Sequence, residues 1–320
     1  MLQRVALGVS DFFNPGTSDE DRRVWDSFHY HSRTFSMAAR LLPRDIQMPV
    51  ATLYLFCRSV DTIADERITE VGAAQALREL DALEQKLSAT LEGFPPDEML
   101  WRRLAQVNQQ VGLQAKPLYE LIAGARWDLT GQTVETEADL AHYSNLVGGC
   151  VGAMMLPFLL DDRSQGASLD EPARALGIAM QITNITRDVG EDRRELNRTY
   201  VPQAWLDDAG LDLDALIGRS PVPVAYQDMM ERMMVSAERY FDACQPGIDA
   251  LPKRVRGAIR GAARMYRGIL NEVRANNYDN LTKRSYVSFP RKIGVLFRDA
   301  YVPRKQRLQV RAGRRLLTAS

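Results

Sequence analysis

The spacing of apolar residues along the chain predicts helices almost throughout. Apolar positions recur at intervals of three and four, as on one face of an α-helix, and no sustained alternation indicates a strand. Helices are expected over residues 19–41, 49–66, 70–92, 223–245 and 252–276, with further helices starting near Asp97, Pro117, Thr136 and Ser168. The predicted fold class is therefore all-α.

Local sequence signals suggest where some of these helices begin. Ser18 with Asp21 has the pattern of a capping box, and Pro49 suits the first turn of a helix. Ser168 with Glu171 would open a long helix that continues past residue 190.

The chain shows no internal boundary. A length of 320 residues alone favours about two domains, but no repeat, linker or change in composition divides the sequence. The segment "SPVPV", 220–224, is expected to be an interhelical loop. We predict a single domain over residues 1–320, with its core at about 19–300 and a basic tail at 302–320.

Composition narrows the classes of function. The 41 basic and 41 acidic residues cancel to a formal net charge of +0, which gives no electrostatic footprint for nucleic acid. Cys57, Cys150 and Cys244 lie far apart among apolar residues, which argues against a disulfide scaffold or a zinc site. Reduced core thiols in a cytosolic protein are expected.

The longest uncharged apolar run is "LVGGCVGAMMLPFLL", 146–160. It falls short of the roughly 18–20 residues that span a bilayer, so a buried helix is expected. The N-terminus shows no convincing signal-peptide pattern. The chain is predicted to be soluble or peripheral to a membrane.

A row of oxygen-bearing side chains is the first sign of chemistry. In "QITNITRDVGED", 181–192, Asn184, Asp188 and Asp192 are spaced by four and would share one helix face. Two carboxylates at this spacing repel by a few tenths of a kcal/mol, so a solvated acidic face is the ordinary interpretation. The alternative is a site for Mg²⁺, which prefers oxygen ligands.

A second row favours the metal site. In "YLFCRSVDTIADE", 54–66, Asp61 and Asp65 are also four apart, and Arg58 lies one turn earlier. Arg187 lies beside the other row. Two such rows facing each other across a helical bundle could hold several Mg²⁺ ions, and the arginines could donate to phosphate oxygens.

The two rows and their surroundings resemble the squalene/phytoene synthase family, the head-to-head prenyl transferases. The similarity extends over about residues 25–300, and "GIAMQITNITRDVGEDRRELNRTYVP", 177–202, is its most specific segment. The other matching segments are "HSRTFSMAARLLP" (31–43), "YLFCRSVDTIADE" (54–66), "YSNLVGGCVG" (143–152) and "MYRGILNEVRANNYDNL" (265–281). The resemblance implies a helical bundle of the isoprenoid synthase type with a central apolar cavity, most similar to bacterial phytoene synthases.

The resemblance also implies roles for individual residues. The implied metal ligands are Asp61, Asp65, Asn184, Asp188 and Asp192. The implied catalytic residues are Asp61, Asp65, Asp188, Asp192, Arg58 and Tyr54. The implied substrate-binding residues are Ser32, Arg58, Tyr143, Val147, Gln181, Arg187, Tyr266, Arg284 and Lys292. The segment 143–152 resembles the family's pocket helix, which contains tyrosine and glycine. The chain departs from the family at Thr62, where a second adjacent aspartate is common, and at Ser144, Asn145 and Gly148 in this pocket helix.

The implied activity is a prenyltransferase reaction of carotenoid biosynthesis. Two geranylgeranyl diphosphates would condense through a cyclopropyl diphosphate to phytoene, with Mg²⁺ (or Mn²⁺) as cofactor, no NADPH, and pyrophosphate released. Ala39 and Ala51 stand where C15-using members can carry bulky residues, which favours a C20 substrate. The alternatives are a C15-using relative (a dehydrosqualene, presqualene diphosphate or squalene synthase) and a non-catalytic helical assembly factor.

A hydrocarbon product predicts a cytoplasmic protein that associates with the membrane surface, because release into a bilayer is favoured over release into water. The basic segment "VPRKQRLQVRAGRRLL", 302–317, would help such binding, and a solvated tail is the alternative.

Overall fold

The computed structural model describes residues 18–31, 36 and 39–282, and every regular element in this part of the chain is helical. The all-α prediction is thus confirmed. The elements are α2 (Asp19–His31), α4 (Arg44–Thr62), η1 (Ile63–Arg67), α5 (Ile68–Val71), α6 (Ala73–Leu91), α7 (Met99–Val111), α8 (Ala115–Leu129), α9 (Glu137–Ser144), η2 (Asn145–Gly149), α10 (Cys150–Leu159), η3 (Arg163–Gln165), α11 (Gly166–Leu196), α12 (Gln203–Ala209), α13 (Leu213–Leu216), α14 (Val224–Ala243), α15 (Gln245–Ala250) and α16 (Lys253–Ala275).

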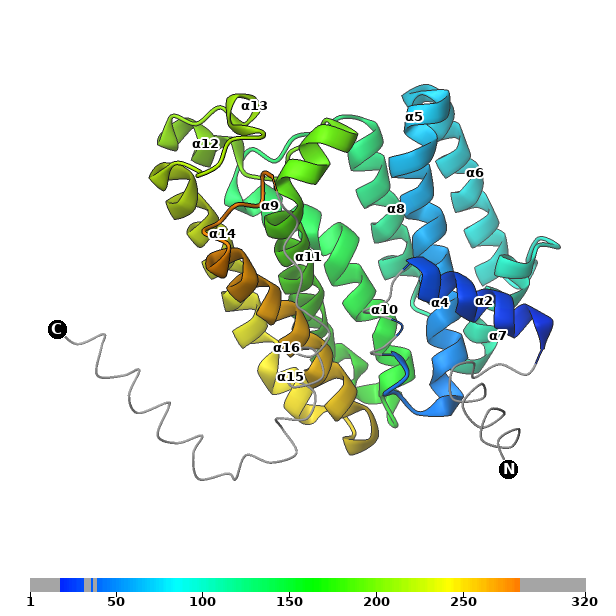
Figure 1. The fold of residues 1–320 in the computed structure, drawn as a ribbon. Helices are drawn as coiled ribbons and strands as arrows, with labels where there is room; N and C mark the ends of the chain where they lie inside the picture. The colour runs from blue at the N-terminus through cyan, green and yellow to red at the C-terminus, as the bar shows by residue number, and fades with distance from the viewer. Residues whose placement is uncertain (1–17, 32–35, 37–38, 283–320) are drawn as a thin grey trace, which may run out of the picture.

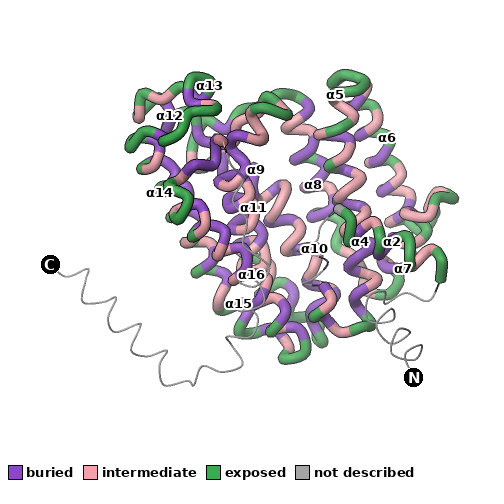
Figure 2. The backbone as a smooth tube through the Cα atoms, in the orientation of Figure 1, coloured by how far each residue is buried: buried purple, intermediate pink, exposed green. Residues whose placement is uncertain are grey.

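Helix α11 runs through the middle of the bundle, with α14, α15 and α16 on one side and α4, α8 and α10 on the other (Figure 1). Its residues are exposed only within the first six and the last three positions (Figure 2). Most of the apolar core falls into two large clusters. One joins α2, α4, α6, α7, α8 and α10, and the other joins the middle of α11 to α12, α14 and α16. A polar row on the middle of α11 therefore has to face the interior.

Two predicted helix starts are confirmed by their capping geometry. The Ser18 N–H donates to Asp21 Oδ2 and the Asp21 N–H donates to Ser18 Oγ, both at 3.1 Å. Thr136 and Asp139 form the same reciprocal pair at the start of α9. The interhelical loop predicted at 220–224 is present up to residue 223, and its last predicted residue, Val224, is already the first residue of α14.

Two other predicted starts are wrong. Helix α4 begins at Arg44 after Pro43, and Pro49 lies in its second turn, where it removes one backbone hydrogen bond of the helix instead of opening it. Helix α11 begins at Gly166, directly after the short turn η3, and Ser168 donates its hydroxyl back to the Gln165 carbonyl instead of capping the helix. Helices α12 and α13 were not predicted, because seven and four residues carry too little periodicity.

The apolar run at 146–160 is a buried helix, as predicted, and it begins as the π-helical turn η2 before continuing as α10. A side chain on Gly148 would place its Cβ 2.6 Å from the Gly177 carbonyl oxygen, and one on Gly152 would lie 2.1 Å from that of Ala173. These glycines therefore let η2 and α10 cross α11 at backbone contact. Within the described residues no helix is long and apolar enough to cross a membrane, and the three cysteines are buried and free.

Candidate active site

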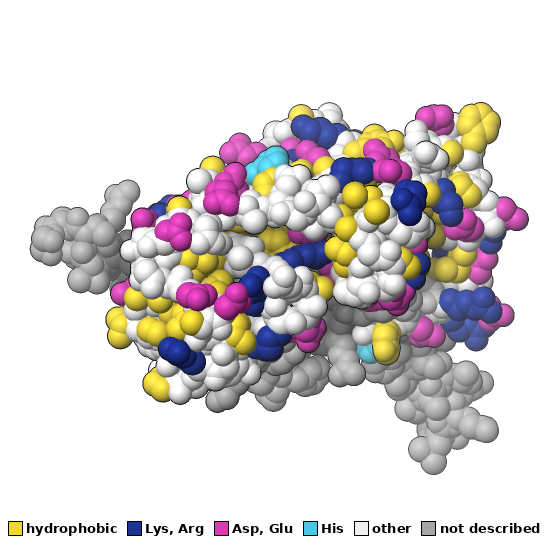
Figure 3. Space-filling model, turned by 90° about the horizontal axis from the view of Figure 1, so that it is seen from above, with side chains coloured by type: hydrophobic (Ala, Val, Ile, Leu, Met, Phe, Trp, Pro, Cys, Tyr) yellow, Lys and Arg dark blue, Asp and Glu magenta, His cyan; other side chains and the backbone are white. Residues whose placement is uncertain are grey.

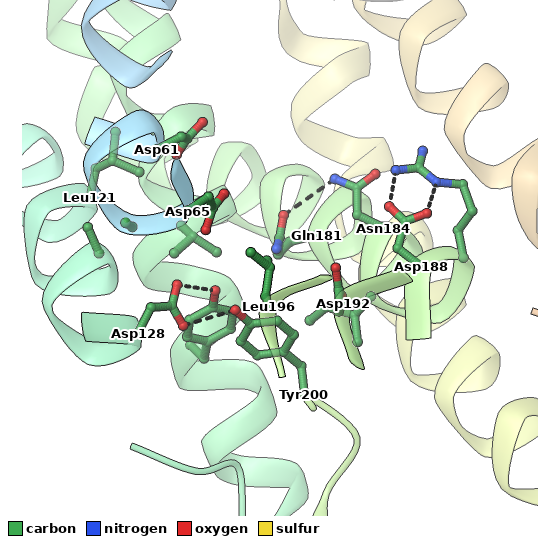
Figure 4. A pocket seen from close by; sticks show the side chains of 16 residues that line it. Asp61, Asp65, Leu121, Asp128, Gln181, Asn184, Asp188, Asp192, Leu196 and Tyr200 are labelled. Atoms are coloured by element: carbon green, nitrogen blue, oxygen red, sulfur yellow. Dashed lines mark hydrogen bonds and ion pairs between the residues drawn. The ribbon is translucent and has the colours of Figure 1, made fainter. Parts of the chain in front are cut away.

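Both acidic rows line one polar cavity of about 410 Å³. Asp61 comes from the last turn of α4 and Asp65 from η1, while Asn184, Asp188 and Asp192 follow one another along α11 (Figure 4). Seen from above, the surface is hollowed between the two halves of the molecule, and basic side chains lie along the hollow (Figure 3). The structure thus brings together two rows that are more than a hundred residues apart in the sequence.

Two π-helical turns border this cavity. The turn η1 carries Asp65, and the turn η2 carries Val147, which also lines the cavity. Single π-helical turns inside α-helices occur frequently at functional sites, because the extra residue changes the direction of the side chains that follow. Sequence periodicity gave no sign of either turn.

The carboxyl groups create an electrostatic cost that a cation would relieve. Desolvation by the surrounding protein, followed by the charge of Asp65, raises the pKa of Asp61 to about 7. The Asp61 side chain still keeps accessible surface because it borders the cavity. Burial, then the charges of Asp188 and Asp65, raises the pKa of Asp192 to about 8. Both shifts mean that the ionised carboxylates lack compensating positive charge.

The donor set fits a hard divalent cation. Asn184 lines the same cavity as the carboxylates, and its buried Oδ1 atom accepts no hydrogen bond from the described residues, which leaves an oxygen acceptor without a donor. In the described part of the chain, no three His, Cys, Asp or Glu side chains lie close enough to form a metal cage. Ligands spread over two walls suit Mg²⁺, which usually completes its shell with water and substrate phosphate oxygens.

The two predicted arginines are placed differently. Arg187 lines the cavity, and its guanidinium holds Asp188 through Nε at 2.7 Å and through Nη2. Arg58 is not among the lining residues. Its Nη2 pairs with Glu66, its charge opposes the rise in the Asp61 pKa, and its buried Nε has no partner among the described residues.

A hydrogen-bonded network around Asp128, a residue that sequence reasoning missed, lines the polar cavity. Asp128 accepts hydrogen bonds from the hydroxyls of Tyr143, at 2.9 Å, and Tyr200, at 3.0 Å (Figure 4). The two rings stack with centroids 4.6 Å apart. Arg198 donates to Asp65 Oδ1 at 2.7 Å and lies 3.8 Å from Asp128 Oδ2. Burial raises the pKa of Asp128 to about 6, against the opposing charge of Arg198.

Only part of that network carried a sequence signal. Tyr143 was predicted as a substrate-binding residue, and Arg198 and Tyr200 lie in the segment 177–202 that carries the family resemblance. Asp128 lies in no motif. It reaches the site only because α8 packs beside η2 and η1.

An apolar cavity of about 330 Å³ adjoins the polar one. The two cavities share five lining residues, Asp61, Leu121, Val147, Gln181 and Asn184. Tyr54 lines the apolar cavity beside Phe28, with ring centroids 4.5 Å apart. Ala39 lines it as well, whereas Ala51 is fully buried and is not among the lining residues.

The remaining predicted site residues are placed as follows. Gln181 lies between the cavities and accepts from Asn184 Nδ2 at 3.4 Å. Tyr266 is buried on α16 in the core cluster next to α11 and does not line either cavity. Ser32, Arg284 and Lys292 lie outside the described residues.

Comparison with known proteins agrees with this geometry. The squalene/phytoene synthase family model matches residues 28–291. The chain belongs to the squalene/phytoene synthase family. It is 31% identical over 266 residues to phytoene synthase of Cereibacter sphaeroides, covering 82% of this chain and 74% of that one. It is 33% identical over 267 residues to a chloroplastic phytoene synthase 2 of Solanum lycopersicum, covering 82% and 84%.

The fold is shared with a solved dehydrosqualene synthase in complex with a ligand. The TM-score is 0.75 at 30% identity, and the match covers 87% of this chain and 96% of the other. The chain is therefore a prenyltransferase with the all-α isoprenoid synthase fold, and it is similar to bacterial and plant phytoene synthases.

Proposed function

We propose that this prenyltransferase condenses two geranylgeranyl diphosphates head to head and forms phytoene, in a reaction that depends on Mg²⁺. The observation that carries the proposal is the junction of the two cavities, where a polar cavity with two acidic rows shares five residues with an apolar cavity. A prenyl diphosphate has the same division, with a charged head and a long apolar chain.

The residues of the polar cavity suit the diphosphate head. Asp61, Asp65, Asn184, Asp188 and Asp192 would hold the metal ions. Bound Mg²⁺ would supply positive charge to the departing diphosphate. Arg187, already paired with Asp188, offers further guanidinium donors for phosphate oxygens, and Gln181 lines both cavities, where the head would meet the chain.

The apolar cavity suits a reaction that passes through carbocations. One allylic diphosphate ionises, and the resulting cation alkylates the double bond of the second molecule, which closes a cyclopropane ring as a proton leaves. The cyclopropyl diphosphate then loses its own diphosphate, rearranges and loses a proton to give the hydrocarbon. Walls such as Leu53, Met155 and Leu159 exclude the water that would quench these cations.

The small lining residue Ala39 supports a C20 rather than a C15 substrate. A bulky side chain at this position would shorten the apolar cavity, and each additional methylene that the cavity buries is worth about 0.8 kcal/mol. Ala51, the second small residue, is fully buried and does not line the apolar cavity, so it can affect the length of that cavity only through its neighbours. A C15-using enzyme is the alternative within the family.

The test is product analysis with C15 and C20 prenyl diphosphates and Mg²⁺ in the absence of a reductant. The expected result is a C40 hydrocarbon from geranylgeranyl diphosphate, with two pyrophosphates released per product. Exclusive formation of a C30 product, or NADPH-dependent squalene formation, would assign the chain to the C15-using relatives. No pyrophosphate release from any prenyl diphosphate would favour a helical assembly factor.

A further inference from the structure

The back of α11 is held by a buried side chain from the segment after α16. Asn280 is only 3% exposed, and its Nδ2 donates to the Thr186 carbonyl oxygen. Its own carbonyl oxygen accepts the Gly190 N–H at 3.1 Å, and its Oδ1 accepts the Tyr226 hydroxyl at 2.6 Å. One residue thus makes two hydrogen bonds to the α11 backbone and is itself oriented by α14.

The two residues of α11 that Asn280 contacts, Thr186 and Gly190, lie on the face of the helix opposite to the predicted metal row. Thr186 and Gly190 are each two residues from Asp188, and two residues along an α-helix turn by about 200°. Asn280 therefore holds the face opposite to the carboxylates, at the same level as Asp188. Asn280, Thr186 and Gly190 are not among the residues that line either cavity.

The segment around Asn280 fits α11 closely. A Cβ atom on Gly190 would lie 2.4 Å from the Leu281 carbonyl oxygen and 2.7 Å from its Cα. Leu281 is fully buried, and its carbonyl oxygen accepts a hydrogen bond from Arg194, one turn further along α11. The buried carboxylate of Asp279 accepts from the Thr282 N–H at 3.1 Å and hydroxyl at 2.6 Å, which fixes the turn of the segment.

We propose that Asn280 is a positioning residue that sets the place of the Asn184–Asp188–Asp192 row relative to Asp61 and Asp65. The inference rests on the proposed function, because it assumes that metal ions and a diphosphate bridge the two rows. Mg²⁺ tolerates little departure from octahedral geometry, so a small displacement of one wall weakens its binding. Removing a hydrogen-bond partner of a metal ligand typically changes metal affinity by about 10–100-fold, and Asn280 acts on the ligand row through the α11 backbone.

The test compares substitutions of two residues that are hydrogen-bonded to each other, Asn280 and Tyr226. Asn280→Ala removes the side-chain contact with Thr186, whereas Tyr226→Phe removes the neighbouring contact with Asn280 Oδ1 and leaves the α11 bonds in place. The measurement is the Mg²⁺ concentration that gives half of the rise in melting temperature produced by a non-ionisable prenyl diphosphate analogue. This concentration should increase about tenfold or more in Asn280→Ala and less than about twofold in Tyr226→Phe.

A second variant covers the case in which Asn280→Ala fails to fold. Asn280→Leu retains nearly the size of the side chain, buries no charge and removes the donor to Thr186, and the same increase is expected. An unchanged Mg²⁺ requirement in the folded Asn280 variants, or an equal increase in Tyr226→Phe, would overturn the positioning role alone. If the wild type shows no Mg²⁺-dependent response to the analogue, the proposed function fails and the inference fails with it.

Discussion

At the scale of single residues, Asp65 and Asp188 already pair with Arg198 and Arg187, whereas Asp61 and Asp192 are unfavourable as carboxylates. The raised pKa values of Asp61, about 7, and Asp192, about 8, reflect the surrounding protein and the neighbouring carboxylates, and Asp61 keeps surface accessible from the cavity. The buried and unpartnered Oδ1 of Asn184 points to the same deficit. In the proposed function, metal ions and a diphosphate would offset both costs.

Asp192→Asn tests this explanation because it retains shape and removes one charge. In the wild type, Mg²⁺ with a non-ionisable prenyl diphosphate analogue should stabilise the fold by about 2.7 kcal/mol at a hundred times the dissociation constant. In Asp192→Asn this gain should shrink sharply, while the Mg²⁺-free protein should be no less stable because a crowded charge is gone. Thermal denaturation with and without both ligands measures the two effects.

The matched control is Glu195→Gln, which removes an exposed carboxylate three residues further along the same helix. It should keep nearly all of the ligand-dependent stabilisation. Equal losses in the two variants would mean that general acidity matters rather than the row, and the assignment of Asp192 as a metal ligand would fail.

At the scale of elements, sequence signals succeeded where they were local. The Ser18–Asp21 and Thr136–Asp139 pairs cap their helices within four residues, so the sequence alone contains the whole interaction. Ser168 failed because the backbone before it was already helical from Gly166. The i, i+4 rows were likewise readable, since both members of each pair lie on one helix.

Features that arise from packing could not be predicted. Asp128 joins Tyr143 and Tyr200 only through the placement of α8 against the pocket helix and the chain after α11. The contact of Asn280 with Thr186 links residues 94 positions apart. Neither has a spacing or composition that marks it in the sequence.

The crossing of α10 over α11 gives a prediction for an element. Gly152→Ala should destabilise the protein by about 1–3 kcal/mol, because the added methyl meets the Ala173 carbonyl at 2.1 Å and backbone cannot yield as a side chain would. Gly257→Ala is the control. It lies exposed within α16 with nothing within 4 Å of the new Cβ, so helix propensity should stabilise it by up to about 1 kcal/mol.

Urea denaturation of both variants measures the difference. If Gly152→Ala were as stable as the wild type, the two helices would not need backbone contact at this position. The glycines of the pocket helix would then be explained better by space for the substrate, since Gly148 and Gly152 also line the apolar cavity.

At the scale of the whole molecule, the site lies between two separately packed apolar clusters. The cluster around α4 and α8 carries Asp61 and Asp65 on its inner side, and the cluster around the middle of α11 carries the other row. Ligands that bridge the rows would therefore contact both halves of the molecule, so substrate binding would depend on how the two clusters pack against each other.

We also propose that the protein associates with membrane surfaces through its basic tail, residues 302–317, which lie outside the described part of the chain. Basic residues near an anionic leaflet gain roughly 1 kcal/mol each. Flotation with anionic liposomes should recover the full chain, and truncation after residue 300 should abolish recovery while leaving product formation in detergent intact. Unchanged flotation of the truncated chain would rule out the tail as the anchor.

The central claim is that the two rows act as one metal–diphosphate site. The most direct measurement is the number of Mn²⁺ ions, used in place of Mg²⁺, that each chain immobilises in electron paramagnetic resonance titrations with a non-ionisable prenyl diphosphate analogue. The wild type should immobilise more than one ion per chain only when the analogue is present, and both Asp61→Asn and Asp188→Asn should lower that number. Analogue-independent binding, or loss from only one of the two rows, would contradict the account.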